Sequence, residues 1–162
     1  MGCYDIPKKK YTNNPVVIPD QSIWCLTSDG DTLYGGTTIG RGSGMDPVTK
    51  EAYLIAWRKK LLWKQAAIPG VTNYNNLLFH AGKLYGTTGT KPFHFFCFDP
   101  AKRAMDYVVE SQISGAREQS ICLGPDGCIY GITWMVLFRW HPETGKIEEI
   151  HRCMGEDAKP YG

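Results

Sequence analysis

Polar side chains recur in three short segments, Pro19–Ser22, Asn73–Asn76 and Arg117–Ser120, each at the start of an apolar run. Amides and hydroxyls dominate these segments, and a Gly-rich stretch after residue 39 adds Arg41. Such groups hydrogen-bond to a sugar, a peptide or another small polar ligand. The candidate ligand-binding residues are therefore Gln21, Arg41, Asn75, Asn76, Arg117, Glu118 and Gln119. The alternative is that these groups cap strand ends and bind water.

Covalent catalysis has little support in the residue spacing. Ser22 and Ser120 have no histidine or acid at a recognisable triad spacing. The stretch Gly40–Gly44 lacks the Gly-Lys-Ser/Thr ending of a phosphate loop. We expect no catalytic residue.

Metal binding is also unsupported. The chain has 6 cysteines and 4 histidines, but no Cys-x-x-Cys pair and no cluster of histidines near the cysteines. We expect His80 in a turn, His94 among aromatic core residues, His141 bonded to backbone in a turn and His151 near a frayed end. Cys122 and Cys128 flank one turn, where they could face each other. We predict no metal ligand.

The elements that position these residues repeat along the chain. An apolar strand, a Gly-containing turn and then Leu/Ile-Tyr-Gly occur three times, around Tyr34, Tyr85 and Tyr130. The spacing of about 50 residues is typical of stacked supersecondary units. Asp29-Gly30 and Asp126-Gly127 supply the positive φ that a tight hairpin needs.

The repeat predicts three four-stranded antiparallel units, at about 21–70, 71–116 and 117–151. An N-terminal arm at 1–14 is polar and loose, an extra strand occupies 16–19, and a tail follows at 152–162. Within the units, the expected strands are 22–26, 32–38, 53–57 and 61–68; 76–79, 83–88, 93–98 and 105–113; and 120–123, 128–133, 136–140 and 146–151. Residues 39–50 are expected to form a long exposed loop.

Residues 51–67 present a conflict. They are rich in Ala, Leu, Lys and Gln, and by propensity they form the most helical segment of the chain. A basic amphipathic helix would suggest a membrane surface or a helix-binding partner. The repeat instead favours a hairpin, because Trp57 then occupies the place of Phe98 and Trp140.

The stretch Phe93–Phe98 has aromatic residues at both odd and even positions. Because successive side chains of a strand point to opposite faces, both faces of this sheet must be buried. A sheet stacked between two neighbouring sheets has that property.

This pattern, continued by Phe/Trp-Asp/His-Pro at Phe98–Pro100 and Trp140–Pro142, resembles the repeats of β-propellers of the SMP-30, NHL and virginiamycin-B-lyase-like kind. The resemblance covers about residues 16–151 and implies an all-β propeller fold. Enzymes of that kind hold a divalent cation with Glu, Asn, Asp or His near the axis. No position here matches such a ligand set, so we expect no cofactor. A divalent cation belongs to the enzyme alternative only.

Propeller rings need about four to eight blades, whereas this chain supplies three. We expect two chains to close a ring of about six blades, since an open stack leaves apolar faces bare. The alternative is that the chain is a piece of a longer propeller.

The totals exclude several classes of protein. A net charge of +2 gives no reason to expect nucleic acid, and no apolar run approaches the ~18 residues of a membrane span. With no secretion signal, the cysteines are expected to be reduced thiols of a cytoplasmic protein. A fragment of an exported protein would look the same.

In a propeller, the connections between blades gather on one face around the central channel, and these connections carry the polar segments. The function expected from these features is non-catalytic binding of a carbohydrate, a small polar ligand or a protein loop on that face. The alternative is a metal-dependent lactonase- or lyase-type enzyme with its site in the channel of a dimer. A third possibility is a purely structural assembly piece.

Overall fold

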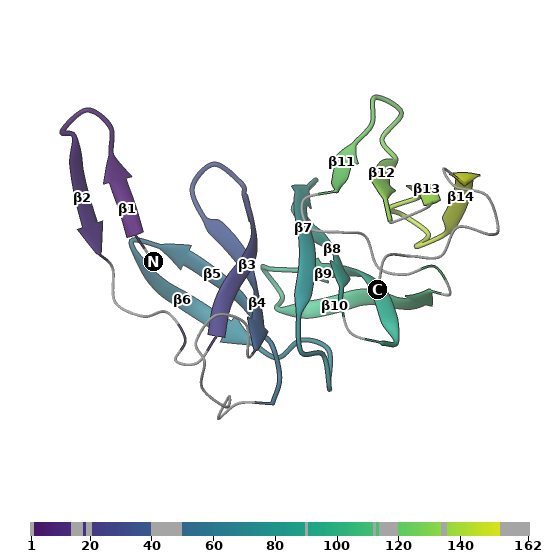
Figure 1. The fold of residues 1–162 in the computed structure, drawn as a ribbon, viewed down its shortest axis with the longest axis horizontal. Helices are drawn as coiled ribbons and strands as arrows, with labels where there is room; N and C mark the ends of the chain where they lie inside the picture. Colours follow the sequence, from purple (N-terminus) through teal and green to yellow (C-terminus); the bar gives the residue numbers. More distant parts are fainter. Residues whose placement is uncertain are drawn as a thin grey trace.

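The computed structural model describes residues 2–13, 18, 21–39, 50–89, 91–111, 113, 120–133 and 136–152. The regular structure in these ranges consists of β-strands, so the protein is all-β. Three four-stranded antiparallel sheets follow one another along the chain, each with its strands in sequence order. Figure 1 shows the second sheet between the first and the third.

The strand bounds agree closely with the predicted units. The first sheet contains β3 (Gln21–Ser28), β4 (Leu33–Ile39), β5 (Leu54–Arg58) and β6 (Lys60–Gln65). The second contains β7 (Tyr74–His80), β8 (Lys83–Thr88), β9 (Phe93–Asp99) and β10 (Ala104–Ser111). The third contains β11 (Ile121–Leu123), β12 (Ile129–Ile132), β13 (Val136–Trp140) and β14 (Ile147–Arg152).

The conflict over residues 51–67 is resolved as a hairpin. β5 and β6 pair antiparallel, with Leu54 opposite Gln65 and Arg58 opposite Lys60. Leu54 and Ala56 are fully buried in the core that the first sheet shares with the second. Burial of β5 on both of its faces therefore overrides the local helix propensity.

The N-terminal arm was predicted to be loose, but its described residues form a hairpin. Gly2–Asp5 (β1) and Lys10–Asn13 (β2) form a two-stranded hairpin, with Tyr4 opposite Tyr11. Figure 1 shows this hairpin apart from the four-stranded sheets. Tyr4 and Tyr11 are solvent-exposed, and no alternating apolar pattern marks the hairpin in the sequence.

Other expectations fall largely outside the described residues. Of the extra strand predicted at 16–19, only Ile18 is described; it lies in a bend and is buried. Residues 40–49 of the predicted loop and residues 153–162 of the predicted tail also lie outside the described ranges.

The core has two parts, one on each face of the second sheet. Phe96 and Phe98 pack with Tyr34 and Leu54 of the first sheet, whereas Phe95 packs with residues of the third sheet. The ring centroids of Phe95 and Trp140 are 5.2 Å apart in an edge-to-face arrangement. These contacts confirm the prediction that both faces of this sheet are buried.

The glycine of each Tyr-Gly pair lies directly beneath a large side chain of the next strand. Gly86 pairs with Phe96 and Gly131 with Phe138, and a Cβ at either glycine would run into the partner ring. In the first sheet, Ile55 lies opposite Gly35. Glycine is thus required here for close packing across strands.

Candidate functional site

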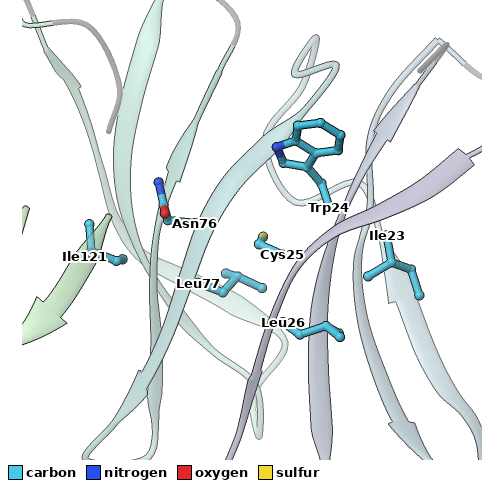
Figure 2. Close-up of a pocket in the computed structure, with 7 residues that line it drawn as sticks. All are labelled: Ile23, Trp24, Cys25, Leu26, Asn76, Leu77 and Ile121. Atoms are coloured by element: carbon cyan, nitrogen blue, oxygen red, sulfur yellow. The ribbon is translucent and has the colours of Figure 1, made fainter. Parts of the chain in front are cut away.

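The first strands of the three sheets are neighbours in space. β7 packs against both β3 and β11. A cavity of about 310 Å³ lies along these strands. It is lined by Ile23, Trp24, Cys25 and Leu26 of β3, Asn76 and Leu77 of β7, and Ile121 of β11. Figure 2 shows these side chains, with Trp24 and Asn76 as the groups that carry polar nitrogen.

Most of the residues that line this cavity have apolar side chains, and none of them is an activated nucleophile. Cys25 is buried, and its Sγ lies 3.5 Å from the carbonyl oxygen of Tyr74. Burial raises the pKa of the Cys25 thiol to about 12, so the sulfur stays protonated at neutral pH. The cavity is therefore suited to non-covalent binding.

Asn76, a predicted ligand-binding residue, lines this cavity but also holds the sheets together. Its side-chain nitrogen donates to the Thr87 hydroxyl at 2.9 Å, and its side-chain oxygen accepts from the backbone N–H of Ser120 at 3.0 Å. The residue is only 1% exposed. It thus ties β7, the first strand of the second sheet, to the start of the third sheet.

Gln21 and Asn75 lie at the starts of β3 and β7, the first strands of their sheets. The Gln21 amide donates to the Glu51 carbonyl at 2.8 Å and accepts a hydrogen bond from the Thr37 hydroxyl. Asn75 accepts from the side chain of Asn73 at 2.9 Å. Arg41, Arg117, Glu118 and Gln119 lie outside the described residues.

Sequence reasoning missed a threonine three residues after each repeat tyrosine. The hydroxyl of Thr37 accepts from the backbone N–H of Tyr53 at 2.7 Å, and that of Thr88 from His94 at 2.9 Å. Thr133 accepts from Val136 at 3.1 Å in the same way. The signal was available, because all three follow Tyr-Gly at one spacing. Through these hydrogen bonds the threonines, at or just after the end of the second strand, hold the backbone at or just before the start of the third strand in each sheet.

Asn73, directly before β7, is a second polar residue that the list of predicted binding residues omitted. It is 9% exposed, and its Oδ1 is buried without a hydrogen-bond partner in the described structure. Gly89 lies against this oxygen, and a Cβ there would collide with Asn73 and Asn75. Burying an acceptor without a hydrogen bond lowers the stability of the fold, so a hydrogen-bond donor placed beside Asn73 Oδ1 would be favourable.

In the described ranges, no group of three or more His, Cys, Asp or Glu side chains is placed to hold a metal ion. His94 is half-buried, with its Nδ1 lacking a hydrogen-bond partner. Among the same residues, no helix has the length and apolar character needed to cross a membrane.

Comparisons with known proteins show similarity in fold only. No family model matches the sequence, and no curated protein matches it significantly. One similar solved structure is the extracellular domain of the putative hybrid two component system BT4673 from B. thetaiotaomicron, with a TM-score of 0.56 and 17% identity. The match covers 89% of this chain and 18% of that chain. At this identity the likeness concerns the fold alone.

Proposed function

We propose that the protein is a non-catalytic binding module built from propeller blades, and that it holds a carbohydrate or a similar small polar ligand against its innermost strands. The observation that carries this proposal is the cavity of about 310 Å³ to which the first strand of each four-stranded sheet contributes. Cavities that bind small molecules are concave and mostly apolar, with a few polar groups that orient the ligand.

The chemistry of the cavity favours a sugar over a charged ligand. Trp24 offers an indole, whose ring face packs against the apolar C–H surface of a sugar. No charged side chain is among the lining residues. The amides of Gln21, Asn73 and Asn75 lie at the starts of the neighbouring strands, where hydroxyl groups of a larger ligand would meet hydrogen-bonding partners.

Ring closure is a second part of the proposal. Leu26 and Leu33 of the first sheet are 51% and 38% exposed, and Ile132 of the third sheet is 42% exposed. Exposed apolar residues on the two end sheets are suited to an interface. A second copy of the chain would supply three more sheets and surround the cavity. Further sheets of a longer polypeptide would serve equally.

The test is calorimetric titration with a panel of mono- and oligosaccharides, on the unmodified chain and on Trp24→Ala. We expect a sugar to bind and Trp24→Ala to weaken its binding by about tenfold or more, since an aromatic contact contributes about 0.5–1.5 kcal/mol in addition to the apolar area that it buries. Leu62→Ala is the matched control, because Leu62 lies on the outermost strand β6 and is 47% exposed. Equal affinities for the unmodified chain and Trp24→Ala, or no binding across the panel, would refute the proposal.

A further inference from the structure

A second cavity lies at the other end of the sheets, beside the turns that follow β7, β11 and β13. It has a volume of about 460 Å³. Its walls include His80 and Tyr85 of the second sheet and Asp126, Cys128, His141 and Glu143 of the third. This volume is sufficient for a small molecule. Two of its wall residues, Cys128 and His141, belong to a set of groups suited to thiol chemistry.

The set consists of a thiol, an imidazole and a carboxylate in line. Cys128 Sγ lies 3.6 Å from His141 Nδ1, and His141 Nε2 lies 3.2 Å from Glu148 Oε2. Cys128 and His141 are both partly exposed. A base in contact with a thiol, itself oriented by a third group, is the general arrangement of an activated nucleophile.

The strand register brings Cys128 and His141 together. Ile129 pairs with Trp140 in the ladder between β12 and β13. Cys128 directly precedes Ile129, and His141 directly follows Trp140, so the two residues are the next facing pair. The turn after β13 fixes the histidine, because its N–H donates to Lys146 O at 2.8 Å and its carbonyl accepts from Gly145 at 2.9 Å.

The charges around the set define the role of each member. Lys146, Arg139 and His141 hold the pKa of Glu148 at about 2, so this carboxylate remains charged and available to the imidazole. Burial and then the Asp126 carboxylate raise the pKa of Cys128. The resting sulfur is therefore a protonated thiol that needs a base, and His141 is the base in contact with it.

We propose that Cys128 is a modification site, at which the thiol exchanges with low-molecular-weight disulfides that enter the second cavity. His141 Nδ1 accepts the thiol proton, and the Cys128 thiolate attacks one sulfur of the disulfide. A new S–S bond joins Cys128 to that half, the original S–S bond breaks, and the other half leaves as a thiolate that takes up the proton. No other oxidant is required. This inference does not depend on the proposed sugar binding.

Cys122 provides an internal comparison. It is an exposed free thiol on β11 of the same sheet. The register pairs Cys122 with Tyr130, so Cys122 does not face Cys128 across the turn as the sequence suggested. Both cysteines are free, and each can be followed in one sample.

The experiment incubates the full chain with oxidised glutathione and measures the adduct at each cysteine over time by peptide mass spectrometry. We expect Cys128 to be glutathionylated, and His141→Gln to slow this reaction by about tenfold or more while the rate at Cys122 stays unchanged. His151→Gln, at an exposed histidine on β14, should change neither rate.

Two further observations keep the test decisive. Cys128→Ser should abolish the adduct at that position only, and the circular dichroism of every variant should match the parent. An unchanged Cys128 rate in a folded His141→Gln chain would overturn the proposal. So would modification of Cys122 with none at Cys128. If His141→Gln fails to fold, Glu148→Gln takes its place, and an unchanged Cys128 rate in that variant also counts against the proposal.

Discussion

Thr88 stabilises the protein through one hydroxyl in a place that water does not reach. The residue is fully buried, and its oxygen is the acceptor for the His94 N–H at 2.9 Å. Thr88→Val preserves the shape of the side chain and removes the acceptor. We expect a loss of about 1–3 kcal/mol in the free energy of unfolding, because the N–H is left buried without a partner. Urea denaturation measures this loss.

Thr144 is the matched control for that substitution. Its hydroxyl also accepts a backbone N–H, from Lys146 at 3.3 Å, but the residue is exposed. Water replaces the lost acceptor there, so Thr144→Val should stay within about 0.5 kcal/mol of the parent. Equal losses for the two variants would show that hydrogen bonding at Thr88 is not the cause.

Single residues were the hardest level to predict from the sequence. Asn76 was identified as a polar group at a strand start, and it does line the cavity, yet both ends of its amide bind neighbouring protein groups. Composition and spacing carry no information about which amides are used internally. The three threonines were missed for the opposite reason, since a hydroxyl acceptor looks ordinary until the next strand is placed beside it.

Elements were easier, because burial leaves a period in the sequence. β8 (Lys83–Thr88) and β13 (Val136–Trp140) were predicted with their observed bounds. Residues 51–67 were ambiguous locally, and only the comparison with the other repeats favoured the hairpin. The β1–β2 hairpin was missed because its apolar residues do not alternate in the sequence, and its facing pair Tyr4 and Tyr11 is 56% and 60% exposed.

The pairing of Gly131 with Phe138 can be tested as an interaction between β12 and β13. A Cβ at Gly131 would meet the Phe138 ring and lie 2.9 Å from a methyl group of Ile121. We expect Gly131→Ala to cost about 1–3 kcal/mol from overpacking. Phe138→Leu removes the ring and relieves the clash, so the double variant should be less destabilised than the sum of the single variants.

A double-mutant cycle in urea measures that coupling, for which about 0.5–3 kcal/mol is the usual range for residues in contact. Strict additivity would mean that the ring is not what excludes a side chain at Gly131. The same argument applies to Gly86 beneath Phe96, so the Tyr-Gly signature marks a packing requirement in both sheets.

At the scale of the whole molecule, the order of the sheets explains why the end faces matter. The second sheet is covered on both sides by its neighbours, whereas the first and third sheets each have one neighbouring four-stranded sheet in the described structure. The sequence predicted this stack from its threefold similarity. Nothing in the sequence shows what covers the outer faces, because an apolar residue at an interface looks the same as one in a core.

Leu33 lies opposite Trp57 in the β4–β5 ladder, while Tyr34 and Ala56 belong to the core shared with the second sheet. Leu33 therefore belongs to the outer face of the first sheet. Ile132 belongs to the outer face of the third sheet, because its neighbour Gly131 pairs with Phe138 and faces inward. If two copies close a ring, light scattering should give twice the mass of one chain. Leu33→Asp and Ile132→Asp should each shift that mass towards a single chain, because an interface would then bury an unpaired charge.

Val108→Asp is the control for those two substitutions, because Val108 is 39% exposed but lies on β10 of the middle sheet, away from the end faces. It should leave the dimer mass unchanged. The change at Leu33 tests the first sheet and the change at Ile132 tests the third, so a ring that uses both faces must respond to both. A well-behaved single-chain mass for the unmodified protein would refute closure by a second copy. A dimer that survives both substitutions would place its interface elsewhere.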